Sequence, residues 1–385
     1  MAADPRTLQE AVLFFADPVN CREYVVARRW PNGVICPRCG SDRVSFLEKY
    51  NRWQCHAGHK DRQFTIKTGT VMEDSPIGLD KWLLAMWLLA NCKNGVSSYE
   101  IARALGVTQK TAWFMLGRIR LGMQDEKTGG KIGGGGGEVE IDETFIGGKA
   151  RNMHKDVKER RQREGRNTGG KAVVLGMLER GKTVRAEVIV DRSKESIQPV
   201  VRANVERRTE IFADEHLYNW RMPNEYSHNV IKHLEAYVDG NVHTNGIENF
   251  WSLLKRGIGG TYVSVEPFHL LRYVDEQAFR FNNRKPMDDG DRFRYLMRKI
   301  VGKRLTYAQL TGKEAGYQPE ENLAVSSLIW TAVTSNTRTS ISNSTSRKDA
   351  AAGRKGPSAT PTTSTSTKGL VNLPYLQTLA SKLAV

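Results

Sequence analysis

A group of cysteines and histidines between residues 36 and 59 is the feature that most restricts how this chain can fold. CPRCG (36–40) has the form of a zinc knuckle, in which two cysteines flank a tight turn that ends in glycine. CHAGH (55–59) supplies a further cysteine but lacks the second cysteine of a regular hairpin. Tetrahedral zinc needs four soft or borderline ligands. The predicted zinc ligands are Cys36, Cys39, Cys55 and His59, with His56 as the alternative to His59.

The wider segment 15–75 is expected to be a zinc ribbon preceded by a helix. VSFLEKYNRWQC and RQFTIKTGTV (62–71) are typical of its strands. Cys21 and Cys92 lie in apolar helical contexts and are expected to be core residues. Five cysteines, mostly near the N-terminus, fit reduced thiols and a metal site better than a disulfide framework.

Residues 78–126 are predicted to be a wholly helical domain. SSYEIARALGVTQKTAWFMLGRIRLGM (97–123) has the pattern of a helix-turn-helix, in which Ser97 or Ser98 caps the first helix and Thr108 caps the second. A recognition helix would present polar and basic groups to a DNA major groove. The alternative is a helical hairpin that only packs. The predicted DNA contacts are Gln109, Lys110, Arg118 and Arg120.

The overall charge points to the same kind of partner. The formal net charge is +16 and the pI is about 9.6, which favours nucleic acid over other partners, although some basic proteins bind no acidic polymer. The apolar run WLLAMWLLA (82–90) is too short to span a membrane. The N-terminal residues lack the basic-then-apolar pattern of a signal peptide. We therefore expect a soluble cytoplasmic protein that binds DNA.

Composition divides the remaining chain into three parts. Repeated glycines predict a flexible linker over 127–137, and alternating strand-like and helix-like segments predict an α/β domain over 138–312. Within that domain, the basic segment 149–171 is either a mobile loop that touches phosphate or a solvated loop. Half of residues 334–367 are Ser or Thr, so the tail, 320–385, is expected to be largely disordered.

Three carboxylates occur in the α/β domain in an order that indicates a shared site. Asp142 lies on a predicted strand, Asp214 ends another, and Glu248 lies in the first turn of a helix with Asn245 as its predicted cap. This order describes an RNase H-like site, with acids on the central strand, after the fourth strand and on a helix that crosses the sheet. Such acids would hold Mg²⁺ or Mn²⁺, and two ions can activate the attacking oxygen and stabilise the leaving one in phosphoryl transfer.

Other interpretations of these acids stay open. Each acid alone is more often solvated than catalytic, and Glu248 alone could simply complement the helix dipole. Asp191 also ends a predicted strand and is the main rival of Asp214. Glu143 and Glu215 neighbour the two aspartates and are expected to point away, because strand side chains alternate between faces.

From roughly residue 15 to 312, the chain resembles the DDE transposases of bacterial insertion sequences, specifically the zinc-ribbon, ISXO-two-like group. The similar motifs are CPRCG, RQFTIKTGTV, EVEIDETFIGGK, HTNGIENFWSLLKRGIGGTY and HLLRYVDEQAFRFNNR. The chain departs from the group in its irregular second zinc hairpin and in its tail. The resemblance implies that Asp142, Asp214 and Glu248 form a metal-binding triad. It also implies that Lys255 and Arg256 meet phosphate.

The resemblance also implies a reaction and its partners. Element ends would be nicked hydrolytically, and the freed 3′-hydroxyl would then attack target DNA. The partners would be the terminal inverted repeats and target DNA, bound by a homo-oligomer on paired ends at the bacterial nucleoid. His243, Asn245 and Asn249 would support the metal site, with Asn249 as a weaker candidate ligand. The alternatives are a nuclease that cuts without strand transfer and a non-catalytic DNA-binding regulator.

Overall fold

The computed structural model describes residues 4–124, 130–147, 159, 171–214, 225–231 and 243–313. These residues all belong to one compact unit that covers residues 1–334. Predictions for most of the basic segment, for Glu215 and for the tail lie outside the described residues. No helix in the described ranges is long and apolar enough to cross a membrane.

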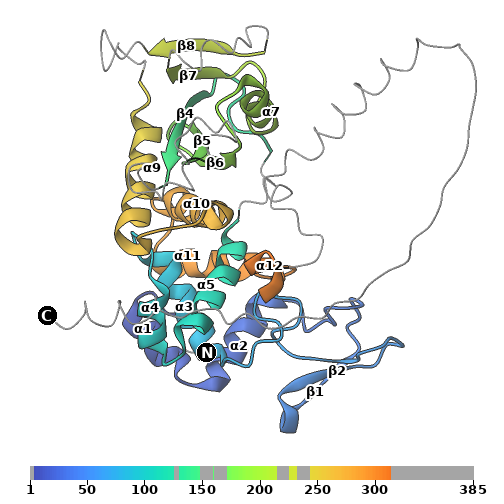
Figure 1. Ribbon diagram of the computed structural model, residues 1–385. Helices are drawn as coiled ribbons and strands as arrows, with labels where there is room; N and C mark the ends of the chain where they lie inside the picture. Colours follow the sequence, from blue (N-terminus) through green and yellow to red (C-terminus); the bar gives the residue numbers. More distant parts are fainter. Residues whose placement is uncertain are drawn as a thin grey trace, which may run out of the picture. The chain divides into compact units, whose positions relative to one another are not determined.

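The N-terminal part of the chain consists of two helices followed by a small antiparallel sheet (Figure 1). Its elements are α1 (Leu8–Phe15), α2 (Pro18–Arg29), β1 (Val44–Leu47), η1 (Glu48–Tyr50), β2 (Arg52–Cys55) and β3 (Gln63–Phe64). β1 and β2 form a hairpin, and β3 pairs with the other edge of β2. The sheet follows the sequence expectation, but the second predicted strand is much shorter than expected.

The shortened strand ends in turns. Thr68 donates its backbone N–H to the carbonyl of Thr65 at 3.1 Å, and Gly69 has a φ of +71°. Such a turn cannot continue a ladder. Thr70 forms an isolated antiparallel bridge with Val301. The second half of the predicted strand therefore connects the ribbon to a segment far along the chain.

A group of helices packs beside the ribbon. Its members are α3 (Leu79–Asn91), α4 (Ser98–Leu105), α5 (Gln109–Met123), α11 (Asp289–Lys299) and α12 (Tyr307–Thr311). Ser97 caps α4 in a capping box with Glu100, and α4 ends at Gly106, whose φ is +59°. Thr108 caps α5 as predicted. Local capping therefore explains where both helices start and where α4 stops.

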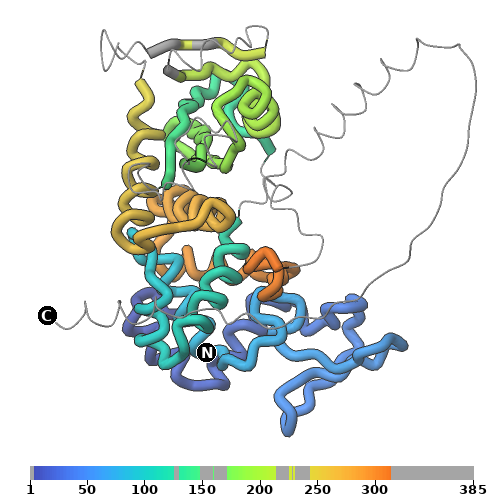
Figure 2. The backbone as a smooth tube through the Cα atoms, in the orientation of Figure 1, coloured from blue at the N-terminus to red at the C-terminus, as the bar shows by residue number. Residues whose placement is uncertain are grey.

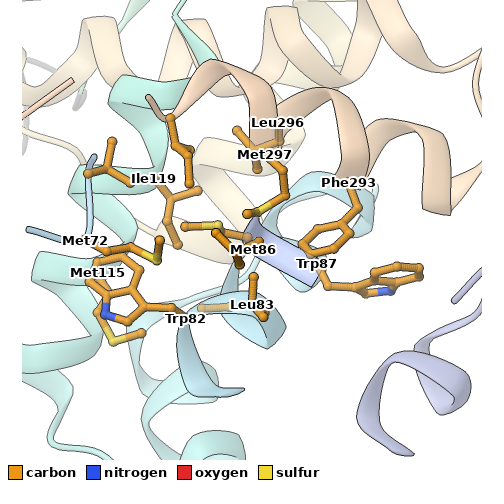
Figure 3. Close-up of a cluster of buried hydrophobic side chains, with 14 of the residues drawn as sticks. Met72, Trp82, Leu83, Met86, Trp87, Met115, Ile119, Phe293, Leu296 and Met297 are labelled. Carbon is orange, nitrogen blue, oxygen red and sulfur yellow. The ribbon is translucent and has the colours of Figure 1, made fainter. Parts of the chain in front are cut away.

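One hydrophobic core joins α3, α4, α5 and α11 to α1, α2 and the ribbon. Figure 3 shows part of it, with labelled side chains from α3 (Trp82, Leu83, Met86, Trp87), α5 (Met115, Ile119) and α11 (Phe293, Leu296, Met297), and with Met72. By sequence α11 belongs to the predicted 138–312 domain, yet its apolar face finds its partners in the N-terminal helices. The two ends of the described chain thus share one core.

The second half of the molecule is built on a five-stranded sheet. Its strands are β4 (Glu138–Ile146), β5 (Ala172–Glu179), β6 (Val184–Ile189), β7 (Glu210–Asp214) and β8 (Ser227–Ile231). They lie in the order β6-β5-β4-β7-β8 (Figure 1). β4, β5 and β6 are antiparallel, whereas β7 pairs in parallel with both β4 and β8. β4 is therefore the central strand.

Helices cover both faces of this sheet. The helices are α7 (Lys194–Asn204), α9 (Asn245–Arg256), the π-helical η3 (Gly257–Tyr262) and α10 (Pro267–Asn283). Figure 2 follows the chain from α9 through η3 into α10. Val139 and Ile141 of β4 pack in the core with α7, while Ile146 packs in the core with α9 and α10. Alternation along β4 thus turns the even-numbered residues toward α9.

The glycine-rich segment is not a flexible linker over the part that is described. Ile132 is buried and forms a parallel bridge with Val205, next to α7. Gly134 donates its backbone N–H to Thr209 Oγ1 at 2.9 Å. At Gly133, with φ +84°, an added Cβ would lie 2.4 Å from the same hydroxyl oxygen. Gly133 is therefore needed for the close approach of this loop to Thr209, which composition alone did not reveal.

Candidate active site and metal centre

The four predicted zinc ligands come together in the ribbon. The ligand atoms of Cys36, Cys39, Cys55 and His59 all lie within 4.8 Å of one another. Two of the separations are 3.7 Å, between the sulfurs of Cys39 and Cys55, and 3.5 Å, between Cys36 Sγ and His59 Nε2. Tetrahedral zinc would place two sulfurs about 3.8 Å apart and a sulfur and a nitrogen about 3.5 Å apart. The donor set and its spacing therefore fit zinc.

The structure distinguishes between the two histidines. His59 Nδ1 lies 2.5 Å from the carbonyl oxygen of Lys60, so Nδ1–H can donate there while Nε2 faces the cysteines. A metal-binding histidine is commonly oriented in this way. His56 Nε2 instead lies 3.0 Å from Ser45 Oγ. His59 thus completes the group of four side chains that could hold zinc, and His56 is not part of it.

The environment of Cys36 favours a thiolate. Burial raises the pKa of this thiol, but hydrogen bonds from the backbone N–H groups of Arg38 and Cys39, and from neighbouring thiols, outweigh it and bring the pKa to about 7. By contrast, burial raises the pKa of Cys21 to about 12. Cys21 is fully buried and donates to the carbonyl of Phe15, as expected for a core residue.

Asp142 lies on central strand β4 and faces α9. Its Oδ2 accepts a hydrogen bond from Trp251 Nε1 at 2.9 Å, and its Oδ1 accepts one from the backbone N–H of Glu143 at 2.8 Å. Gly176, its partner on β5, allows this approach, because a Cβ there would lie 2.6 Å from the Trp251 ring. The carboxylate is therefore held in a fixed orientation between β4 and α9.

Glu248 lies on α9, one turn before Trp251, and is exposed. Thr244 donates its hydroxyl to Glu248 Oε1 at 3.1 Å. Thr244 is also the residue that precedes the helix, so the prediction of Asn245 as the cap was wrong by one position. The Thr244 side chain makes no capping hydrogen bond and donates to Glu248. Asn245 and Asn249 are both exposed.

Asp214 is the last residue of β7, which lies directly beside β4. The parallel register pairs Glu140 with Phe212, and each strand reaches its aspartate two residues later. The backbone of Asp214 is thus on the strand next to Asp142. Its side chain lies outside the described part of the structure.

The side chains of Asp191 and Glu143 interact with groups other than Asp142 and Glu248. Asp191 Oδ1 accepts hydrogen bonds from the hydroxyls of Ser193 and Ser196, both at 2.6 Å, at the start of α7. Burial raises the pKa of Asp191, but these hydrogen bonds outweigh it and leave the pKa below its usual value. Glu143 faces away from Asp142, as expected, and forms an ion pair with Arg192. Neither residue joins the Asp142 side of β4.

Sequence reasoning missed Glu140 and Arg180. Glu140 is only 1% exposed and lies on the same face of β4 as Asp142. Arg180 Nε donates to Glu140 Oε1 at 3.0 Å. The sequence did hold a signal, because acids at positions 138, 140 and 142 of one strand share a face. Such crowding of like charges requires a cation nearby.

Two segments of the chain match known protein families, and both include candidate sites. Residues 135–282 match the family described as ISXO2-like transposase domain, and residues 17–60 match the transposase zinc-ribbon domain. The chain belongs to the ISXO2-like transposases. The first matched segment contains all three acids, and the second contains all four zinc-cluster ligands.

A curated relative of this transposase comes from Halobacterium salinarum. It is described as an uncharacterized protein in transposable element ISH50, and it is 25% identical over 238 residues. The alignment covers 59% of this chain and 79% of the relative. No solved structure matches the chain significantly. The description of this relative, like those of the two matching families, refers to a mobile element.

In this transposase, two of the predicted DNA contacts on α5 are buried. Arg118 is 5% exposed and donates to the carbonyl oxygens of Leu305 and Glu73. Arg120 is 3% exposed and forms an ion pair with Glu276 at 2.6 Å. Both guanidinium groups are bound to other groups of the same chain, so their prediction as DNA contacts was wrong. The helical pattern placed them near the end of α5 but could not show that α10 and α12 cover it.

The first turn of α5 is more accessible. Lys110 is exposed, with its ammonium 5.1 Å from the ring centre of Tyr307, and Gln109 Nε2 donates to Ser98 Oγ at 2.9 Å. The basic residues at the end of α9, Lys255 and Arg256, are also exposed. Of the predicted DNA contacts, these four remain compatible with binding.

Proposed function

We propose that this transposase catalyses metal-dependent cleavage of DNA strands at the ends of an insertion sequence and transfer of the 3′-hydroxyl ends into target DNA. The catalytic domain is RNase H-like, and Asp142, Asp214 and Glu248 hold Mg²⁺ or Mn²⁺. The observation that carries this proposal is the hydrogen bond from Trp251 on α9 to Asp142 on β4. It brings the helix of Glu248 against the strand of Asp142.

The sheet supports the same assignment. Asp142 is on the central strand, Asp214 ends the neighbouring parallel strand, and Glu248 is on a helix that packs on the sheet. This is the order expected of an RNase H-like site. Hydrogen bonds to Asp142 and Glu248 orient each carboxylate without taking all of its acceptor positions, because a carboxylate offers about four.

The acids and the metal have separable roles. When bound, the metal ions would activate the attacking oxygen and stabilise the leaving oxygen of an in-line displacement. The protein's part is to hold oxygen ligands at fixed positions, which Trp251 does for Asp142 and Thr244 does for Glu248. Lys255 and Arg256 extend from the same helix as Glu248 and would bind phosphates of the DNA strand.

The N-terminal part would bind the element ends. In this proposal, zinc held by the Cys36 cluster fixes the ribbon, and Gln109 and Lys110 contact DNA at the start of the recognition helix of a helix-turn-helix. The N-terminal residues of such a helix are the ones that reach base edges. A homo-oligomer would hold two element ends together.

An excision and insertion assay tests the proposal. The gene is expressed beside its flanking DNA, and wild type is compared with Glu248→Gln, which keeps the size of the side chain but removes its charge. We expect movement of the element with wild type alone. Loss of a metal ligand should reduce the rate by more than the ~10–100-fold typical of residues that only support a ligand.

Other outcomes would change the proposal in defined ways. Movement with both proteins would leave transposition intact and remove Glu248 from the metal site. With purified protein and Mn²⁺, cutting of DNA without joining would favour a nuclease. Binding without cutting would favour a regulator. Glu266→Gln is the matched control, because this exposed glutamate at the start of α10 undergoes the same change and is not one of the proposed ligands.

A further inference from the structure

Arg180 contacts two of the elements that carry the proposed catalytic acids, β4 and β7, and the segment that leads into the third, α9. It follows β5, at the turn into β6, and its side chain is 14% exposed. Its guanidinium donates to Glu140 Oε1 at 3.0 Å and to Glu138 Oε2 at 2.9 Å, both on β4. It also donates to the carbonyl of His243, before α9, at 2.5 Å, and lies 3.8 Å from the ring centre of Phe212 on β7.

Glu140 continues this connection into α9. It is 1% exposed, and its second oxygen accepts the backbone N–H of Ile247 at 2.8 Å. Thr244 does not cap this helix with its side chain, so a carboxylate from β4 binds one of the first N–H groups instead. Gly246 permits the approach, because a Cβ there would lie 2.8 Å from Glu140 Oε2.

A buried carboxylate needs a partner, and Arg180 supplies it. A planar guanidinium can bind several acceptors in fixed directions, which an ammonium cannot. His243 Nδ1 adds a contact at 3.5 Å from Glu140 Oε1. Arg180 and Glu140 therefore form a polar junction between two strands and a helix, inside the sheet–helix interface rather than on its surface.

The junction is close to the acids along each element. Glu140 precedes Asp142 by two residues on β4, and Phe212 precedes Asp214 by two residues on β7. Ile247 directly precedes Glu248. Because strands and helices transmit small displacements over such short distances, the junction sets how the three acid-bearing backbones are spaced. A displacement of about 1 Å can cost a factor of about 100 in rate.

We propose that Arg180 and Glu140 are positioning residues that hold β4, β7 and α9 at the spacing required for metal binding by Asp142, Asp214 and Glu248. The inference rests on the proposed function. Neither residue is assigned a contact with DNA or metal. Both act through the backbone of the elements they join.

The test measures Mn²⁺ binding to the purified full chain by electron paramagnetic resonance, alongside cleavage of DNA. The variants are Arg180→Lys, which keeps the charge but not the fork of donors, and Glu140→Gln, which keeps the shape. Lys182→Gln is the matched control, because Lys182 lies in the same turn and its side chain is 68% exposed. Each protein is studied well below its own melting temperature.

We expect both variants to bind Mn²⁺ roughly 10- to 100-fold more weakly than wild type, as is typical when support for a metal ligand is lost. Their cleavage should need correspondingly more metal, while DNA affinity stays unchanged and Lys182→Gln behaves as wild type. A purely structural role would lower the melting temperature without changing Mn²⁺ affinity in the folded protein.

Unchanged Mn²⁺ affinity in folded Arg180→Lys and Glu140→Gln would overturn the proposal. A wild-type protein that binds no Mn²⁺ would overturn it together with the metal site. A wild-type protein that binds Mn²⁺ but cuts no DNA would refute the proposed function only. Weaker binding by the two variants would then still support their positioning role.

Discussion

At the scale of single residues, His56 and His59 differ in what their rings contact. His59 faces the cysteines, whereas His56 contacts Ser45. The spacing of cysteines and histidines was enough to predict the ligand set. It favoured His59 but left His56 open, because the choice depends on the path of the loop after Cys55. It missed Glu140 altogether, although Glu140 shares a strand and a face with Asp142.

His59→Ala should remove bound zinc, while His56→Ala should retain it. The first substitution removes one of four ligands, and the second removes only a contact with a hydroxyl. Zinc content of the purified proteins, measured by mass spectrometry, checks this. Equal zinc content in the two variants would show that another group completes the site.

At the scale of elements, α5 carries exposed and buried cations on one helix. Lys110 in its first turn is exposed, while Arg120 near its end is paired with Glu276, a fully buried carboxylate. Helix positions were predictable here because capping residues and apolar periodicity are local signals. The burial of Arg120 was not predictable, since α10 and α12 come from more than 140 residues later in the chain.

Lys110→Gln should therefore affect mainly DNA binding, and Arg120→Gln mainly the stability of the fold. Lys110→Gln should weaken DNA binding and change the free energy of unfolding by less than about 0.5 kcal/mol. Arg120→Gln should lower the free energy of unfolding by roughly 2–3 kcal/mol, less than for a fully unpaired buried charge, because Arg280 still faces Glu276.

Denaturant unfolding and DNA titration of both proteins measure these effects. The two substitutions are matched, because both residues lie on α5 and each substitution removes one positive charge. If Arg120→Gln unfolds like wild type but binds DNA poorly, Arg120 must leave its buried site to reach DNA. That result would make Arg120 a DNA contact after all.

At the scale of the whole molecule, the N-terminal helices share their core with the last described ones. Phe293, Leu296, Met297 and Ile300 are all at most 3% exposed and pack in the core with α3 and α5. No local sequence pattern predicts this pairing, because apolar periodicity shows which face of α11 is buried but not against which partner. The sequence therefore predicted the elements better than their grouping into domains.

Two truncations test this shared core. Removal of residues 335–385, outside the compact unit, should leave the free energy of unfolding unchanged. Removal of residues 286–385 also takes Phe293, Leu296, Met297 and Ile300 out of this core, each stabilising by about 1.5–3 kcal/mol, or on the order of 6–12 kcal/mol together. That equals most of the stability of a typical domain, about 5–15 kcal/mol.

The chain that lacks residues 286–385 should therefore be insoluble or unfolded, as judged by circular dichroism. The chain that ends at residue 334 serves as its control. A folded N-terminal fragment that lacks residues 286–385 would show that the helices of the first half close their core alone.

The net charge of +16 should make DNA binding strongly dependent on salt. Cations on DNA are released when lysines and arginines neutralise phosphates, so the logarithm of the affinity should fall linearly with the logarithm of salt concentration. Titrations between about 50 and 200 mM salt should show a loss of at least ~10³-fold if six or more phosphates are contacted. A flat response would mean that charge contributes little to binding.

The shared core also has a consequence for how the protein is made. A ribosome releases residues 11–123 long before residues 279–300, and at about 5–20 residues per second this gap lasts from several seconds to about half a minute. During that interval, the side chains of α3 and α5 that face α11 have no partner. Folding of the N-terminal helical core thus finishes only after nearly all of the sheet has been synthesised, so the proposed binding of DNA by nascent chains would begin late and close to completion.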